Sequence, residues 1–319
     1  MKKKAVFFTF IAVFIVVLLI AVSSTKTTFR YREKSESISQ RVHTLNVMVD
    51  DFSKDYDRAL FIAGYRGLLS MNSYVRDTQG YIGNVDDVFY EILLNGTANS
   101  STLELMSEGV DGASLNDLLD RVNEQASNIG FIITHNVTDV HLYQESPWSV
   151  KIKIDSIIVI SDIKGAAKWS SEDTRFKEIS IIGFEDPLYI INTDDKVTNL
   201  INITPDYDFV FDATNDSTVL EAHLTNSFYI ASNESPSFLM RYTGNMSASQ
   251  FGIESMVNLE ELNAQNIPLL ERSVIDYIYF GTGSTSDLCN VTGMSSWFRI
   301  DEEHEEAYEV DRLESASCT

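Results

Sequence analysis

Residues that bind metals or form disulfides are scarce in this sequence. Its 319 residues include two cysteines and five histidines. A zinc cluster and a disulfide-dense scaffold are excluded, because both need several such side chains close together. Basic residues are also few: 24 Lys and Arg stand against 47 Asp and Glu, and the net charge is −23. A nucleic-acid partner held by phosphate neutralisation needs a basic face and is therefore excluded as well.

Proline is scarce too, with five residues in the chain and none between Ala5 and Val75. Proline inside a helix removes a backbone hydrogen bond and clashes with the preceding turn. The whole stretch can therefore form one nearly continuous helix. Hydrophobic residues make up 44% of the chain, which is enough for a sizeable core in one or two domains.

An unbroken apolar run extends from Ala5 to Val22, directly after three lysines, and Thr9 is its only polar member. Eighteen helical residues rise about 27 Å, close to the hydrocarbon thickness of a bilayer. A cleaved secretory signal is the alternative, because residues 21–23 can serve as a cleavage site. The apolar part of such signals is usually about 7–15 residues long. We therefore predict a retained anchor that contacts the lipid bilayer through residues 5–22.

Charge is distributed unevenly along the chain. Residues 1–34 contain seven basic side chains and one acid, Glu33, so they sum to about +6, and the remainder sums to about −29. Basic residues flank the apolar run on both sides, but the three lysines ahead of it are the more tightly packed group. In membrane proteins, Lys and Arg next to a membrane span are enriched on the cytoplasmic side. This favours a cytoplasmic N-terminus and an extracytoplasmic body.

Asn-x-Ser/Thr triplets, the acceptor sequence of N-glycosylation, occur eight times, whereas chance predicts roughly three or four. Those at Asn202 and Asn233 are followed by proline, which weakens them. The other six are the glycosylation candidates: Asn95, Asn99, Asn136, Asn215, Asn245 and Asn290. The alternative is a surface simply rich in Asn, Ser and Thr. The excess supports an extracytoplasmic body.

Residues 37–75 read as one long helix. Apolar residues recur at alternating steps of four and three, as in a coiled coil, at Ile38, Val42, Leu45, Val49, Phe52, Tyr56, Ala59 and Ala63. The first four of these form a candidate surface for self-association: Ile38, Val42, Leu45 and Val49. The alternative is an amphipathic helix that packs on its own domain. We favour this for the part after Phe52, where the apolar face becomes broader and more aromatic.

The remaining pattern predicts an α+β fold. Short helices are expected at 85–94 and 114–130, where Ser114 caps the second helix and Gly130 ends it. Alternation then predicts a long strand at 150–160, with antiparallel neighbours near 131–134, 140–143 and 176–182. The second half alternates strand-like runs at 208–211, 228–231 and 274–280 with a short helix near 252–262. The acidic end of the chain, from residue 302 onward, is expected to be peripheral.

These elements predict five segments, in the order anchor, helix, helical segment, sheet and mixed region. They are a membrane anchor with its basic flank at 1–34, a long amphipathic stalk helix at 35–80, a helical segment at 81–130, an antiparallel β region at 131–200 and a mixed β/α region with an acidic tail at 201–319.

Candidate catalytic and metal sites are weak. Carboxylates gather at 301–306 around His304, and at Asp206, Asp208 and Asp212, but a charge run is usually a solvated face and the second group lacks the elements of a calcium loop. Gly281 and Gly283 precede Ser284, but the segment has neither a strand–serine–helix elbow nor a credible histidine partner. We predict that the protein is not an enzyme and holds no cofactor or metal.

Two further features concern the body. Residues 184–189 are specified as a turn, because Asp186 precedes Pro187; such a turn either plugs an edge of the core or binds a partner.

Cys289 and Cys318 are the only thiols. In an extracytoplasmic setting they are expected to form a disulfide, which would stabilise the fold by about 3–4 kcal/mol. The alternative is two free thiols.

The start of the chain resembles archaeal type IV pilin-like proteins, with a short basic leader that ends at Lys4-Ala5 and a hydrophobic helix that runs into an amphipathic one. The resemblance implies cleavage between Ala5 and Val6. Phe10 stands at the fifth mature position, where many pilins have glutamate. The body, at 147–148, 182–189 and 252–255, is similar to uncharacterised membrane-anchored archaeal cell-surface proteins.

The sequence thus predicts a single-pass, membrane-anchored cell-surface protein, pilin-like at its N-terminus, with a structural or adhesive role. An extracytoplasmic ligand-binding or accessory subunit of a membrane complex is the alternative, and an anchored hydrolase is a weaker one. Without glutamate at position 10, we expect anchored monomers or small clusters rather than long filaments.

Overall fold

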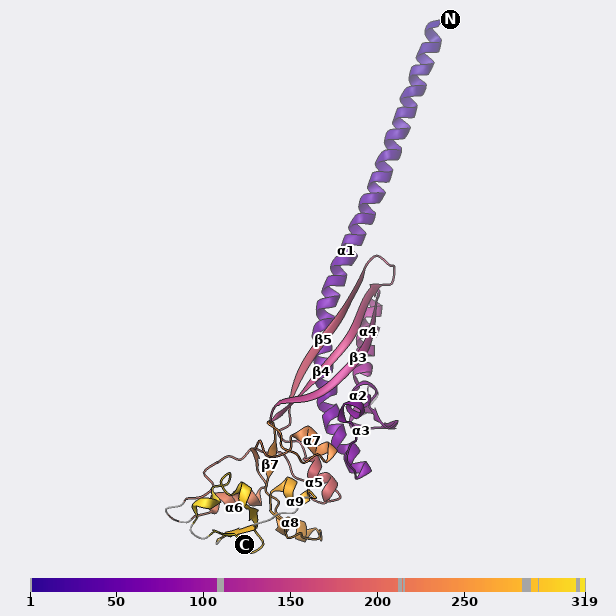
Figure 1. The fold of residues 1–319 in the computed structure, drawn as a ribbon. Coiled ribbons are helices and arrows are strands. Elements are labelled where there is room, and N and C mark those ends of the chain that lie inside the picture. Colours follow the sequence, from indigo (N-terminus) through magenta and orange to yellow (C-terminus); the bar gives the residue numbers. More distant parts are fainter. Residues whose placement is uncertain are drawn as a thin grey trace. The chain divides into compact units, whose positions relative to one another are not determined.

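A computed structural model of the chain describes residues 2–107, 112–211, 214, 216–282, 288–291, 293–313 and 316–318. It confirms the predicted α+β class: a long N-terminal helix is followed by short helices and small sheets without a barrel (Figure 1). The contacts divide the chain into two compact units. Unit 1 comprises residues 1–56, 120–136 and 157–172, and unit 2 comprises 57–119, 137–156 and 173–319.

Helix α1 (Lys2–Thr78) is 77 residues long and has no break between its apolar and amphipathic parts. This confirms the long helix expected from the absence of proline. Its apolar face after Leu45 packs inward, and Phe52, Tyr56 and Ala63 are buried. Gly64 allows close packing against β4, because a Cβ atom there would lie 2.4 Å from Cδ1 of Ile152 and that side chain would have to shift.

The two predicted short helices are confirmed as α2 and α4. In α2 (Val85–Asn95), the side chain of Asn84 accepts hydrogen bonds from the backbone N–H groups of Asp86 and Asp87. Gly96 ends this helix in the left-handed conformation, with φ of 69°. Helix α4 (Leu115–Asn128) begins after Ser114, whose hydroxyl oxygen accepts a hydrogen bond from the N–H of Asp117 at 3.2 Å.

The main sheet has three strands in the order β3 (Phe131–Ser146), β4 (Ser149–Asp162) and β5 (Lys168–Ser180). Strand β4 confirms the predicted alternation: Ile152, Ile154 and Ile158 are fully buried, and Lys151 lies on the other face. The two strands predicted at 131–134 and 140–143 are one continuous strand, and β5 starts eight residues before the predicted position.

The second half of the chain consists of short elements joined by loops. The helices are α5 (Pro187–Asn192), α6 (Thr218–Thr225), α7 (Phe238–Thr243), α8 (Leu259–Ala264) and α9 (Asp276–Phe280), with the 3-10 turns η2 (Glu302–His304) and η3 (Val310–Arg312). The strands are β6 (Tyr229–Ala231), β7 (Ile253–Ser255), β8 (Leu288–Val291), β9 (Ile300–Asp301) and β10 (Ala316–Cys318). Between α2 and α4 lie β1 (Thr97–Ala98), β2 (Ser101–Thr102) and α3 (Glu104–Ser107).

Three sequence predictions for this half need correction. The expected strand at 208–211 is a loop. Of the expected strand at 274–280, Ile275 makes an isolated antiparallel bridge with Met256, whereas residues 276–280 form α9, whose first residue, Asp276, accepts a hydrogen bond from the buried Arg241. The helix expected near 252–262 is strand β7 followed by α8. The strand expected at 228–231 is confirmed as β6, which pairs antiparallel with β7.

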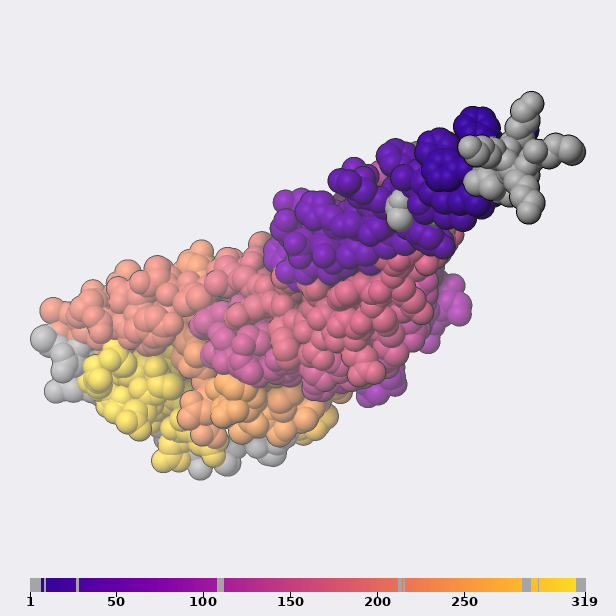
Figure 2. All heavy atoms as spheres, turned by 90° about the horizontal axis from the view of Figure 1, so that it is seen from above, coloured from indigo at the N-terminus to yellow at the C-terminus, as the bar shows by residue number. Residues whose placement is uncertain are grey.

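The acidic end of the chain is not peripheral. His304, Tyr308, Val310 and Leu313 are buried, and three of them pack in one cluster with Phe209. The apolar residues between the acids face the core, so the charge run is one side of a packed segment. Figure 2 shows the last third of the chain, coloured from orange to yellow, packed side by side.

Candidate functional site

The first part of α1 is apolar and uncovered. The large apolar side chains that the structure describes between Phe7 and Val22 are exposed by between 38% and 73%, and the helix contains a strongly apolar segment that is not buried at all. Apolar side chains normally leave water on folding, which contributes about 25 cal/mol for each Å². By length and composition, this helix can cross a membrane. The backbone of the predicted processing site, Ala5 and Val6, is helical.

Arg41 marks the point where α1 meets the rest of unit 1. Its guanidinium donates a hydrogen bond to the backbone oxygen of Ile129 at 3.2 Å and lies 3.4 Å from Oδ1 of Asp162. It also stacks over the ring of Phe131, 5.6 Å from the ring centroid. Asp162 is fully buried at this ion pair.

The candidate self-association surface is divided at this point. Ile38 and Val42 are each 40% exposed, whereas Leu45 is 4% exposed and Val49 is half-buried. Leu45 therefore packs within its own unit and is not available to a second copy. Sequence alone could not separate these four residues, because the apolar repeat passes through all of them without change.

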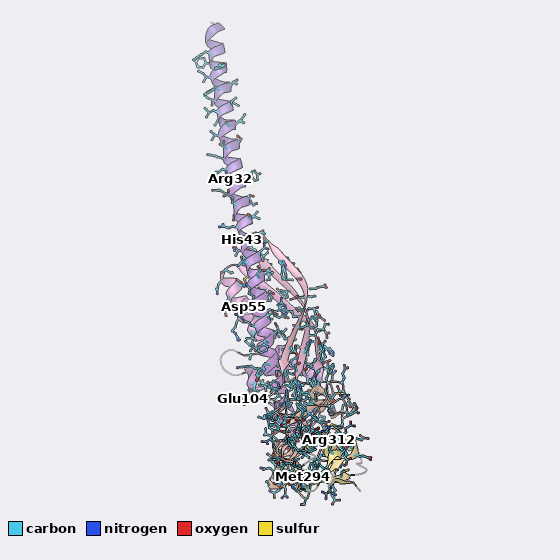
Figure 3. The ribbon with its side chains drawn as sticks, turned by 90° about the vertical axis from the view of Figure 1, so that its left-hand side faces the viewer. Arg32, His43, Asp55, Glu104, Met294 and Arg312 are labelled. Carbon is cyan, nitrogen blue, oxygen red and sulfur yellow. The ribbon has the colours of Figure 1, made fainter. Side chains whose placement is uncertain are left out.

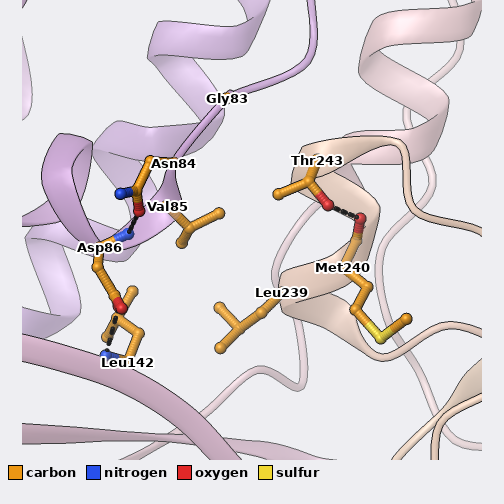
Figure 4. A pocket seen from close by; sticks show the side chains of 8 residues that line it. All are labelled: Gly83, Asn84, Val85, Asp86, Leu142, Leu239, Met240 and Thr243. Atoms are coloured by element: carbon orange, nitrogen blue, oxygen red, sulfur yellow. Dashed lines mark hydrogen bonds between the residues drawn. The ribbon is translucent and has the colours of Figure 1, made fainter.

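A groove in unit 2 lies between the start of α2, strand β3 and helix α7 (Figure 4). Its volume is about 270 Å³, and apolar side chains line it: Val85, Leu142, Leu239 and Met240. A neighbouring hollow of about 500 Å³ shares Asn84 and Asp86 with it and adds the side chains of Asp87, Tyr90, Asp139 and His141. We call the two together the α2 groove; its floor is apolar and its rim is acidic.

Local hydrogen bonds occupy the polar groups on this rim. Asp86 accepts a hydrogen bond from the backbone N–H of Leu142 at 2.8 Å, and its other oxygen lies 2.6 Å from Nδ1 of His141. Asn84 donates a hydrogen bond to Asp87 at 2.7 Å. Within the residues that the structure describes, no three His, Cys, Asp or Glu side chains are arranged to hold a metal ion.

An ionic network lies at the centre of unit 2. Nη1 of Arg241 lies 2.5 Å from Oδ2 of Asp186 and 2.9 Å from Oδ2 of Asp276, and all three side chains are fully buried. Tyr229 donates a hydrogen bond to Asp186 at 2.7 Å, and Ser255 donates one to Asp276 at 2.9 Å. Burial raises the pKa of Asp276 to about 6, although the positive charge of Arg241 acts in the opposite direction.

The segment predicted as a turn at 184–189 belongs to this network. Asp186 accepts a hydrogen bond from the N–H of Leu188 at 2.8 Å and caps α5, with Pro187 at the first helical position. Phe184 and Tyr189 are 2% and 1% exposed. The segment is therefore a buried part of the core, and its residues do not form an exposed loop.

His304 is the centre of a second buried polar cluster. Its Nδ1 lies 2.6 Å from Asp301, and its Nε2 lies 3.0 Å from the hydroxyl of Tyr277 and 3.6 Å from Glu254. Burial acts to lower the pKa of His304, but the hydrogen bonds and negative charges of Asp301 and Glu254 outweigh it and raise this pKa to about 10. The imidazole is thus held charged between two carboxylates.

The other weak candidates are explained locally or lie outside the described residues. Asp206 accepts a hydrogen bond from the N–H of Asp208 at 3.0 Å, which stabilises their loop. Asp212, Gly283 and Ser284 are outside the described residues.

The six glycosylation candidates differ in exposure. Asn95, Asn99, Asn136 and Asn245 are exposed, and Asn290 is half-buried in β8. Asn215 is outside the described residues. Exposure is needed for modification, so Asn290 is the least accessible of the described five.

Cys289 is buried in β8 and is disulfide-bonded. Strands β8 and β10 pair antiparallel, with Cys318 directly opposite Cys289 in the register. No free cysteine is found among the described residues.

No protein-family model, no curated protein and no solved structure matches this chain.

Proposed function

We propose that the protein is anchored in a membrane by the first part of α1 and carries its body on the extracytoplasmic side as a cell-surface protein with a structural or adhesive role. The uncovered apolar segment of α1 supports this proposal most directly. A second support is its continuity with the part of α1 that packs on the body. The pilin-like start of the chain fits a surface protein of this kind.

Fractionation of cells that express the native chain tests the anchor. The protein should stay with membranes through a carbonate wash and be released by detergent, because residues 5–22 have the length of a bilayer span. Sequencing of the native N-terminus separates three outcomes: Met1 for an uncleaved anchor, Val6 for pilin-like processing, and Ser24 for a secreted protein. Recovery of the unprocessed chain in the washed soluble fraction would contradict the proposal.

Protease protection in sealed cells tests the orientation. An extracytoplasmic body should be digested by external protease without permeabilisation. If the exposed Asn-x-Ser/Thr sites are glycosylated, enzymatic deglycosylation should also shift the electrophoretic mobility of the protein. Substitution Asn245→Gln should remove one such step, and Asn290→Gln should not, since Asn290 is half-buried.

The α2 groove favours a second function, in which the body binds a ligand or a partner as an accessory subunit of a membrane complex. Its apolar floor and acidic rim suit a ligand with apolar groups and a positive charge. Leu239→Glu would place a negative charge in the apolar part of the groove and should abolish such binding. Detergent-solubilised complexes that contain a second protein only when Leu239 is intact would support this alternative.

A further inference from the structure

The part of α1 just beyond the apolar run carries basic and aromatic side chains on a regular helix. Because α1 is unbroken from Lys2 to Thr78, the relative directions of these side chains are fixed. Lys26, Arg30 and Lys34 are spaced four residues apart and therefore share one face of the helix. We call residues 26–34 the basic collar. Figure 3 shows side chains around the labelled Arg32 extending from α1 into open space.

The three residues before the collar can lie within hydrocarbon. The hydroxyl of Ser24 donates a hydrogen bond to the backbone oxygen of Ala21 at 2.9 Å, and Thr25 donates to Ala21 at 3.1 Å and Val22 at 3.0 Å. Hydroxyl groups satisfied by their own helix are tolerated in lipid. The span can thus extend to residue 25, and its 21 residues rise about 31 Å, which equals the thickness of a hydrocarbon core.

This length places the collar at the level of the lipid headgroups. Lys26 is then the first residue beyond the hydrocarbon, and Arg30 follows about 6 Å farther out. The polar layer of each leaflet is about 5–8 Å thick. Phe29 and Tyr31 are 63% and 73% exposed at this level, which is the depth where aromatic side chains collect in membrane proteins.

Most of the positive charge of the collar has no ion-pair partner: the collar contains four basic side chains and one acid, Glu33. Arg32 pairs with Glu36 at 3.0 Å, but none of the ion pairs formed by residues in the described ranges involves Lys26, Arg30 or Lys34. Salt screens interactions over about 8–10 Å, so these cations act on groups close to them. At this depth the anions outside the protein are lipid phosphates and anionic headgroups.

We propose that the basic collar binds anionic lipid headgroups and fixes where α1 leaves the bilayer. The proposal rests on the membrane anchoring proposed above. Each basic residue near an anionic membrane surface contributes about 1 kcal/mol, which corresponds to about a fivefold preference for anionic over neutral lipid. Lys26 and Arg30 contribute most, and Lys34 less because it lies farther out.

Site-specific crosslinking of the full chain tests this. A photoreactive phenylalanine analogue replaces Phe29, and the chain is reconstituted in vesicles of equal parts phosphatidylglycerol and phosphatidylcholine. Mass spectrometry then gives the ratio of the two lipid adducts. We expect the anionic lipid to be favoured at least fivefold, with the ratio falling towards one in the K26Q/R30Q/K34Q variant and at high salt.

The matched control is K2Q/K3Q/K4Q, which removes the same charge from the other end of the apolar run and should leave the ratio at position 29 unchanged. Equal labelling of both lipids in the unmodified collar would overturn the proposal, even though the anchor itself would stand. Adducts to a second copy of the chain in place of lipid would also overturn it, since the acidic body would then be the partner. Absence of any lipid adduct together with soluble protein would instead refute the anchor.

Discussion

Nη1 of Arg241, on α7, lies 2.5 Å from Oδ2 of Asp186, the residue that caps α5, and both side chains are fully buried. The same Arg241 nitrogen holds Asp276 at the start of α9. One guanidinium therefore connects three short helices that have few residues of their own to pack. Helices this short are not stable alone, so the network fixes their mutual placement within unit 2.

Removal of Arg241 should unfold or strongly destabilise the body. Arg241→Met leaves two buried carboxylates without a cation, and breaking such a pair from one side costs about 3–5 kcal/mol. Urea unfolding of the detergent-solubilised chain measures the loss. Arg312→Met is the control, because Arg312 is 55% exposed in its pair with Glu309 and should change stability by less than about 0.5 kcal/mol. Equal midpoints for both variants would show that the network contributes little.

His304 should make the body unstable at alkaline pH. Its pKa is raised from 6.5 to about 10 by Asp301 and Glu254. The folded state thus binds a proton that the unfolded state loses, and this contribution is complete below pH 6.5 and lost as pH rises towards 10. His304→Gln should flatten the fall of stability between pH 7 and 10, and His43→Gln, on the exposed face of α1, should not. An unchanged slope in His304→Gln contradicts the assignment.

His223 should lower the stability of the body at acidic pH. It is buried against Phe209 and Tyr308, with ring centroids 5.0 and 5.4 Å away, and burial lowers its pKa to about 4. In the unfolded state His223 takes up a proton as the pH falls below about 6.5, whereas in the folded state it stays neutral down to about pH 4. The free energy of unfolding therefore falls by about 3 kcal/mol as the pH drops from 6.5 to 4.

His223→Phe keeps an aromatic ring in this cluster and should remove that loss. Asp276 has the opposite slope in a similar range, because its pKa is raised, but it is present in both proteins and cancels in their difference. The difference in unfolding free energy between His223→Phe and the unmodified chain should therefore grow steadily from pH 6.5 to 4. A constant difference would show that His223 does not titrate as proposed.

The parts that the sequence predicted well are those with a long, regular period. Helix α1 repeats one apolar face over many turns, and β4 alternates over more than ten residues, so local rules agree with tertiary packing. Helix α4 was also predictable, since Ser114 at its start carries the capping signal itself.

The missed elements depend on partners distant in the sequence. Residues 274–280 alternate like a strand, yet Asp276 forms an ion pair with Arg241, 35 residues earlier, and residues 276–280 form α9. The prediction of a peripheral acidic tail is wrong because the apolar residues Tyr308 and Val310, which lie between the acids, are buried in the core. The α2 groove brings together α2, β3 and α7, and no local motif marks it.

The bridge of Cys289 should hold the end of the chain against β8. Non-reducing peptide mapping should recover Cys289 and Cys318 as one linked pair, with neither thiol open to alkylation. Reduction, or the Cys289→Ser/Cys318→Ser double variant, should lower the unfolding free energy by about 3–4 kcal/mol, because a loop of about 30 residues is released. Alkylation of both thiols in the native protein would contradict the bridge.

The exposed part of the apolar face of α1, at Ile38 and Val42, should determine how copies of the chain associate. Filaments of pilin type bury the hydrophobic helices against one another, so the apolar run must leave a bilayer in which it is already stable. Phe10 brings no charge that would assist this. Ile38 and Val42 remain free for pairing, whereas Leu45 is committed to its own unit.

We therefore expect pairs or small clusters of stalks just outside the membrane. With the native cysteines bridged, a Val42→Cys chain should form disulfide-linked dimers on mild oxidation in native membranes. Leu45→Cys should not, because that side chain is 4% exposed. Equal dimer yields at the two positions would show random collision, and no dimer at Val42 would show isolated stalks. Sheared filaments built from this chain would overturn the expectation, because a filament core must take up residues 5–22 as well, and pairing through Ile38 and Val42 alone leaves those residues in lipid.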